Sequence, residues 1–188
     1  MRFLSDLWLP VLVSGAICFV WSAVAWMVLP HHKGEWKRLA TEPEVLAALR
    51  QSMPAKGLYM FPFSLGADLN RTDTKRALEM GPVGYLAIGS TGVPSMAKML
   101  AQSFVLYLVT SLLCAYVAWN VAPGSKLGVP YLATFRIVGT IATMAYVLGS
   151  APESIWFGRP WKSWVSQAFD GTVMGLLTAG VFGWLWPQ

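Results

Sequence analysis

Charged residues are scarce in this sequence. They make up 12% of its 188 residues, whereas a soluble globular protein usually carries about a quarter. Hydrophobic residues make up 55% of the chain. This balance argues against a soluble globular protein and predicts an integral membrane protein.

Cysteine is almost absent as well. Cys18 and Cys114 are the two cysteines of the chain, and both lie inside apolar segments without a C-x-x-C pair or a nearby histidine. The pattern offers no cysteine-based metal site. Both residues are expected to be small buried hydrophobic groups.

The short motifs of several enzyme classes are missing too. The sequence contains no P-loop, no G-x-S-x-G and no H-E-x-x-H, so it lacks the known spacings for phosphate binding, a serine nucleophile or a zinc protease. We therefore expect a non-catalytic protein, and no cofactor is predicted.

Basic residues exceed acidic ones, with a net charge of +5. They lie beside apolar segments and form no basic stripe with interleaved aromatic residues, so anionic lipid headgroups are a better partner than nucleic acid. Tryptophan is abundant near the ends of the apolar segments, as in the interfacial belt of membrane proteins. These tryptophans are Trp8, Trp26, Trp36, Trp119, Trp161, Trp164, Trp184 and Trp186.

Four segments have the length and composition of membrane-spanning helices. At about 1.5 Å per residue, a helix of about 20 residues crosses a hydrocarbon core of about 30 Å. The segments are residues 7–29, 99–121, 130–149 and 164–186. They predict an all-α integral membrane protein, a single-domain bundle of four transmembrane helices.

The first segment also has features of a signal peptide. Arg2 precedes it, and Ala23-Val24-Ala25 imitates a cleavage site. However, the apolar run exceeds the usual length of about 7 to 15 residues, and Asp6 weakens the positive charge before it. We therefore expect a retained span.

Polar residues gather between the first two segments, in residues 30–98. The capping box Thr-Glu-Pro-Glu at residues 41–44 predicts one short helix, and residues 73–80 predict a second. Two apolar runs, residues 58–61 and 83–88, are expected either to pair as strands or to lie on the bilayer surface. The sequence thus predicts a small mixed α/β insert outside the membrane.

Lys and Arg are unequally divided between the two sides of the predicted bundle. Four spans put the insert and residues 150–163 on one side, and both termini with residues 122–129 on the other. The basic residues near the membrane are Lys33, Lys37, Arg38, Lys98, Arg159 and Lys162 on the insert side, and Arg2 and Lys126 on the opposite side. By the positive-inside rule, we expect a cytoplasmic insert and both termini outside.

Two charged residues interrupt the predicted spans. A charge inside a bilayer costs about 2.5 to 3.5 kcal/mol on insertion scales, which makes Arg136 and Asp170 candidates for function. Helical side chains lean toward the helix N-terminus, so these two residues are expected near opposite membrane faces and not as a pair. Lys98, at the start of the second span, is the expected partner of Asp170. We interpret both charges as structural, with a proton, ion or substrate path as the alternative.

Histidines 31 and 32 follow the first span directly, with Glu35 close behind. Residues of these types can bind a metal or haem. Adjacent residues of a helix do not share a face, however, and the chain has no third histidine. We therefore interpret His31, His32 and Glu35 as part of a polar interfacial anchor and predict no metal, with a haem or quinone pocket as the alternative.

Small residues recur every four positions along the fourth segment, at Gly171, Gly175, Ala179 and Gly183. Such a ridge lets another helix approach closely. We expect it to pack inside the bundle, with the Ser14, Cys18 and Ser22 face of the first span as its natural mate. A partner protein or a second copy of the chain is the alternative.

Five stretches give the chain a resemblance to known proteins. They are residues 30–33 (PHHK), 58–62 (LYMFP), 135–140 (FRIVGT), 155–161 (IWFGRPW) and 179–187 (AGVFGWLWP). In these stretches the chain resembles a group of small bacterial inner-membrane proteins with no assigned activity. The resemblance covers nearly the whole length and implies a bacterial inner membrane, but it implies no catalytic residue or cofactor.

These observations lead to three functional hypotheses. The first is a non-catalytic accessory or scaffold subunit of a membrane complex, which binds another membrane protein or copies of itself. The second is a transporter or channel component that uses Arg136 and Asp170. A cofactor-binding or enzymatic membrane protein is the third.

Overall fold

The computed structural model describes residues 2–122 and 127–188, which form two compact units. The helical unit comprises Met1–Lys33, Ser95–Pro152 and Pro160–Gln188. The insert unit comprises Gly34–Pro94 and Glu153–Arg159. The sequence predicts one membrane domain with a polar insert at about residues 30–98. The insert unit comprises part of that range and, in addition, Glu153–Arg159.

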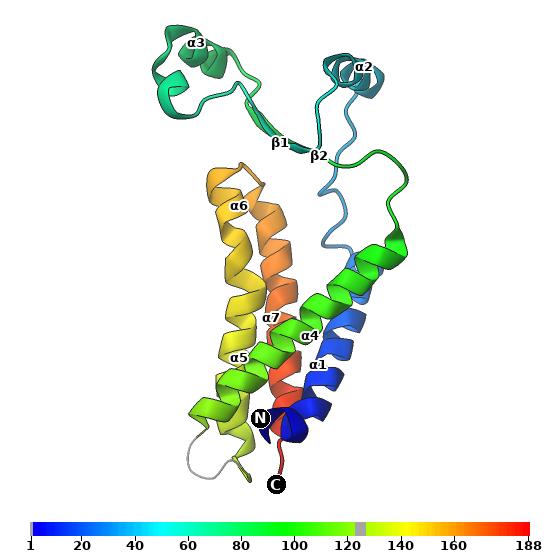
Figure 1. Cartoon of the computed structure of the whole chain (residues 1–188), viewed down its shortest axis with the longest axis vertical. Helices are drawn as coiled ribbons and strands as arrows, with labels where there is room; N and C mark the ends of the chain where they lie inside the picture. The colour runs from blue at the N-terminus through cyan, green and yellow to red at the C-terminus, as the bar shows by residue number, and fades with distance from the viewer. Residues whose placement is uncertain (1, 123–126) are drawn as a thin grey trace. The chain divides into compact units, whose positions relative to one another are not determined.

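The helical unit contains four long helices (Figure 1). They are α1 (Arg2–Met27), α4 (Met96–Val121), α5 (Tyr131–Val147) and α7 (Trp161–Trp184). Helix α1 packs on α4 and α7, and α5 packs on α7 and α4. Successive long helices run in opposite directions, so α1 begins and α7 ends at the same end of the unit.

Local sequence signals explain where these helices begin. Ser95 caps α4, because its Oγ accepts a hydrogen bond from the backbone N–H of Lys98 at 3.3 Å. Helices α5 and α7 each begin directly after a proline, Pro130 and Pro160, whose fixed φ suits a helix start.

Three helices among the described residues are long and apolar enough to cross a membrane: Phe3–Met27, Met96–Val121 and Tyr131–Trp156. They contain most of the predicted spans 7–29, 99–121 and 130–149. The predicted fourth span, residues 164–186, falls in α7, which is not among the three. The reason lies in its first half, where Lys162, Gln167 and Asp170 lower the mean hydropathy.

The insert unit contains the predicted mixture of helices and strands. Strands β1 (Gly57–Phe61) and β2 (Gly84–Ile88) pair antiparallel, with Tyr59 opposite Leu86. Of the two arrangements expected for these apolar runs, the structure therefore has strand pairing. The helices of this unit are α2 (Glu42–Ser52), the 3₁₀ helix η1 (Gly66–Asn70) and α3 (Thr72–Met80). Helix α2 begins after Thr41, although the Thr41 side chain makes no capping hydrogen bond.

The segment after α5 is largely helical. A 3₁₀ turn, η2 (Leu148–Ser150), leads into the short helix α6 (Ala151–Trp156). Glu153 and Arg159 then form an ion pair of 2.9 Å across the turn that follows α6. Gly158 takes a positive φ of 66° in this turn, a conformation that glycine adopts without steric cost.

The small-residue ridge of α7 lies against α5. A Cβ at Gly171 would come within 3.0 Å of the Tyr146 carbonyl oxygen, and one at Gly183 within 2.7 Å of the Tyr131 ring. A Cβ at Gly175 would overlap Thr143. Internal packing of the ridge is therefore confirmed.

The prediction that the ridge packs against α1, on the face of Ser14, Cys18 and Ser22, is wrong. Helix α1 contacts a different stripe of α7: the Cys18 Sγ lies 3.3 Å from the Thr178 Oγ1 and 3.6 Å from the Met174 carbonyl oxygen. Ser14 of α1 contacts Ser111 of α4, and their hydroxyl oxygens are 2.9 Å apart. Spacing alone identifies a close-packing face but does not say which of two neighbouring helices covers it.

The contact between Gly175 and α5 predicts that adding a single methyl group at this position destabilises the fold. Gly175→Ala should lower the free energy of unfolding by about 1–3 kcal/mol, because the new Cβ meets the Thr143 backbone as well as its side chain. The matched control is Gly180→Ala on the same helix, where the nearest atom to an added Cβ is the Tyr131 Oη at 3.9 Å. Unfolding in detergent, followed by circular dichroism, measures both variants. Equal stability of the two would contradict the packing.

Candidate functional site

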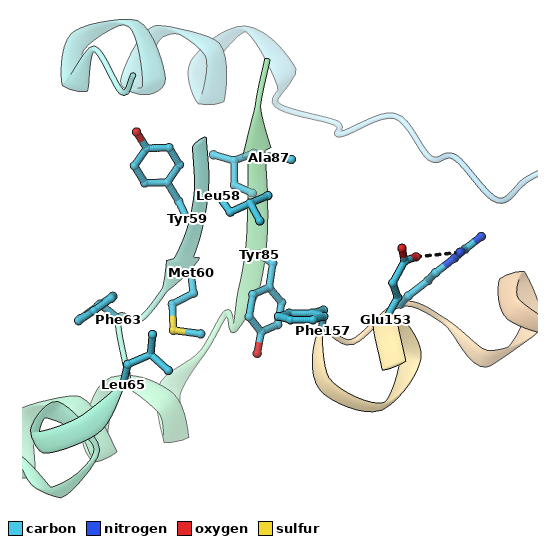
Figure 2. A pocket seen from close by; sticks show the side chains of 11 residues that line it. Leu58, Tyr59, Met60, Phe63, Leu65, Tyr85, Ala87, Glu153 and Phe157 are labelled. Atoms are coloured by element: carbon cyan, nitrogen blue, oxygen red, sulfur yellow. Dashed lines mark hydrogen bonds and ion pairs between the residues drawn. The ribbon is translucent and has the colours of Figure 1, made fainter. Parts of the chain in front are cut away.

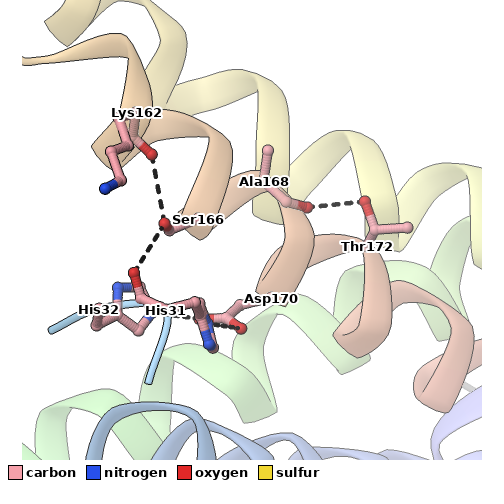
Figure 3. A network of polar contacts seen from close by, with 7 residues as sticks. All are labelled: His31, His32, Lys162, Ser166, Ala168, Asp170 and Thr172. Carbon is pink, nitrogen blue, oxygen red and sulfur yellow. Dashed lines mark hydrogen bonds and ion pairs between the residues drawn. The ribbon is translucent and has the colours of Figure 1, made fainter. Parts of the chain in front are cut away.

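Three residues from two segments that are far apart in the sequence form one polar cluster in the helical unit (Figure 3). His31 and His32 lie in the turn that follows α1, and Asp170 lies in α7. The His31 Nε2 is 2.9 Å from the Asp170 Oδ1, and the His32 Nε2 is 2.6 Å from the Asp170 Oδ2. Each carboxylate oxygen therefore has its own imidazole.

The cluster is largely removed from solvent. Asp170 is 5% exposed and His32 is 7% exposed, while the His31 side chain keeps 24% of its surface accessible. A buried carboxylate is costly unless it is paired and hydrogen-bonded. The two imidazoles supply this pairing, and His31 leaves the cluster accessible from one side.

Neighbouring side chains hold the two imidazoles in place. The Trp26 ring stacks on the His32 ring with centroids 4.1 Å apart and an interplanar angle of 4°. Phe169 meets the His31 ring edge-on at 5.6 Å. The Ser166 Oγ donates to the His31 carbonyl oxygen at 3.2 Å, which ties the turn to α7. Both rings are thus oriented before any ligand arrives.

The prediction that Lys98 pairs with Asp170 is wrong. Lys98 is exposed, and both carboxylate oxygens of Asp170 are engaged by the histidines. The histidines reach Asp170 because the turn that follows α1 folds back onto α7. Glu35, the third ligand candidate, belongs to the insert unit.

His31 and His32 would not share a face if they belonged to a helix. Residues 31–34 instead form a turn, and a turn can aim two adjacent side chains at one group. The sequence did contain the relevant signal, since an acidic residue buried in an apolar segment needs a partner. The only histidines of the chain lie at the end of a neighbouring apolar segment.

Arg136 lies elsewhere in the helical unit, on the outer face of α5. Its side chain is exposed, and among the described residues no ion pair involves it. Arg136 and Asp170 do not pair, as predicted. A groove of about 510 Å³ surrounds the arginine. The other residues that line the groove are Phe135, Gly139, Thr140, Thr143, Met144, Val147, Leu148 and Leu176.

The insert unit has a larger groove of about 770 Å³ (Figure 2). Apolar side chains dominate its lining, and the Glu153–Arg159 ion pair lies at one side. The hydroxyls of Tyr59 and Tyr85 donate to backbone carbonyls, those of Ala55 and Trp156. The chemistry of this groove is therefore that of binding an apolar group. Its apolar lining includes Leu58, Met60, Phe63, Leu65, Leu86, Ala87 and Phe157.

Comparison of the chain with protein-family models, curated proteins and solved structures finds no match. The resemblance to small bacterial inner-membrane proteins stays a prediction. Function must therefore be inferred from the geometry of the helical unit and of the two grooves.

The Asp170 contacts predict energetic coupling with His32. In a double-mutant cycle, Asp170→Ala and His32→Phe should cost less together than the sum of their separate costs, with a coupling of about 0.5–3 kcal/mol. Phenylalanine keeps an aromatic ring against Trp26 and removes the contact with the carboxylate. The measurement is the free energy of unfolding in detergent.

The control for this cycle replaces His32→Phe with Lys98→Ala. Because Lys98 is exposed, its cost should add to that of Asp170→Ala within experimental error. Coupling of Asp170 to Lys98, together with additivity for His32, would restore the original pairing and contradict the structure.

Proposed function

We propose that the chain is an integral protein of the bacterial inner membrane with a bundle of four spans, in which α7 is the fourth. Its 24 residues reach about 36 Å as a helix, enough for a hydrocarbon core of about 30 Å. The polar residue Asp170 is buried, whereas Val165, Phe169 and Leu176 are exposed. Mean hydropathy counts every side chain, but lipid contacts only the outward face, and that face of α7 is largely apolar.

Within that membrane, we propose that the chain is a non-catalytic accessory subunit. The observation that carries this proposal is the exposed Arg136 in the groove along α5. An arginine on a lipid-facing surface is costly, and a carboxylate in a neighbouring span would neutralise it. Thr140 and Thr143 beside it are small enough for another helix to approach closely.

The occupant that best fits this groove is a transmembrane helix of a partner protein that carries an Asp or Glu. The groove follows α5 from Phe135 to Leu148, a rise of about 20 Å at 1.5 Å per residue. That length suits a helix better than a lipid headgroup, whose contact would be confined to Arg136. The α7 ridge offers no such surface, because α5 covers it.

The four-span arrangement predicts the accessibility of introduced cysteines. A cysteine placed at the N-terminus or at Gln188 should react from outside with a thiol reagent that does not cross membranes, and one at Asn70 should not. The native Cys18 and Cys114 are buried, so their background labelling should be low. Labelling of only one of the two termini would mean an odd number of spans, and the reverse pattern would contradict the positive-inside orientation.

The partner groove predicts a contact that depends on charge. A photo-crosslinking residue at Thr140 should join the chain, in native membranes, to a protein with an Asp or Glu in a membrane span. Arg136→Glu should reduce this crosslink at least about tenfold, because it puts two like charges together. Reversing the partner's acidic residue to Arg should then restore it.

The control places the same crosslinker at Val20, an exposed position on α1, where no specific partner is expected. Crosslinking at Thr140 only to lipid or only to a second copy of the chain would contradict the proposed partner helix. So would a crosslink that Arg136→Glu leaves unchanged.

A further inference from the structure

We propose that His31, His32 and Asp170 form a binding site for one divalent transition-metal ion of the Zn²⁺ type. The site goes beyond the accessory role and does not depend on it, since Arg136 is not one of the proposed metal ligands. Two imidazole nitrogens and a carboxylate oxygen converge from two separate segments, as the protein ligands of an open zinc site do.

The distances suit a shared ion. One potential ligand atom from each residue lies within 4.8 Å of the other two. With bonds of about 2.0–2.2 Å to zinc, two ligand atoms in a tetrahedral site lie about 3.3 Å apart. The observed separations of 2.9 and 2.6 Å from nitrogen to oxygen need to widen by less than about 1 Å.

Charge balance also favours a cation. Asp170 brings a carboxylate into a largely buried place. A charge in such a place is stabilised by pairing or by coordination to a metal. A divalent ion would replace the two hydrogen bonds of the carboxylate with stronger electrostatic contacts.

The donor set selects the class of ion. Imidazole nitrogen with carboxylate oxygen suits Zn²⁺ and its divalent first-row neighbours, whereas Ca²⁺ and Mg²⁺ prefer ligand sets made of oxygen alone. The absence of sulfur from the three residues makes a Cu⁺ site unsuitable. Three protein ligands leave a fourth position, and the partly exposed His31 would let water or an exchanging ligand reach it.

The surroundings of the ligands resemble a prepared site more than a chance contact. Trp26 fixes the His32 ring by stacking, and Ser166 fixes the backbone of His31. Groups that orient metal-ligating histidines raise the affinity of a metal site, and their loss typically costs about 10- to 100-fold. The structure thus provides both the ligands and their support.

The test uses the full chain in mild detergent, purified without a polyhistidine tag and stripped of metal by a chelator. Titration with ZnCl₂, followed by calorimetry, should give one ion per chain. Asp170→Asn should weaken binding at least about 100-fold, and His31→Ala at least about tenfold. Asp73→Asn, at an exposed position of α3, is the matched control and should leave the affinity unchanged.

Direct coordination has its own signature. Co²⁺ in place of Zn²⁺ should give visible absorption bands of a tetrahedral ion in the wild-type chain and in Asp73→Asn, but not in Asp170→Asn. Circular dichroism checks that each variant is folded, and His31→Ala, at the most exposed ligand, keeps the test decisive if an Asp170 variant fails to fold.

Two results would overturn the proposal: no zinc binding by the wild-type chain, or binding that survives both Asp170→Asn and His31→Ala. Arg136→Glu should leave zinc affinity unchanged. The metal site and the partner groove can therefore fail separately.

Discussion

The burial of one carboxylate organises the helical unit. Asp170 lies in α7 with almost no exposed surface, and a carboxylate there requires partners. His31 and His32 supply them only because the chain turns back toward α7 after α1 ends. These contacts tie the turn that follows α1 to α7.

Helix α7 is the common neighbour of α1 and α5, and it uses a different surface for each. Its glycine and alanine ridge allows close approach of α5, and Met174 with Thr178 contacts Cys18 of α1. Because these surfaces and the Asp170 contacts are buried, α7 can be more polar than the other long helices while its exposed face stays largely apolar. The composition of α7 includes these buried polar groups, so it does not show how apolar the exposed face of the helix is.

Much of the fold follows from local sequence signals, and the site does not. Apolar length predicts the three helices that are long enough to cross a membrane, and Ser95 caps the start of α4. The two short apolar runs, for which strand pairing was one of two expectations, pair as strands. Spacing revealed the α7 ridge but not that α5 would cover it, since that choice depends on how helices pack. The two histidines and Asp170 are nearly 140 positions apart, so only the tertiary structure brings them together.

The central claim is that both histidines contact the Asp170 carboxylate. Solid-state NMR can measure this in lipid bilayers, because the chain has only two histidines and ¹⁵N-histidine labelling reports on them alone. Dipolar recoupling to ¹³C-labelled aspartate carboxyl carbons should give two ring nitrogens, one from each histidine, within about 4 Å of a carboxyl carbon, as direct contacts require. Both couplings should disappear in Asp170→Asn. Absence of the couplings in the wild-type chain, or their persistence in the variant, would contradict the account.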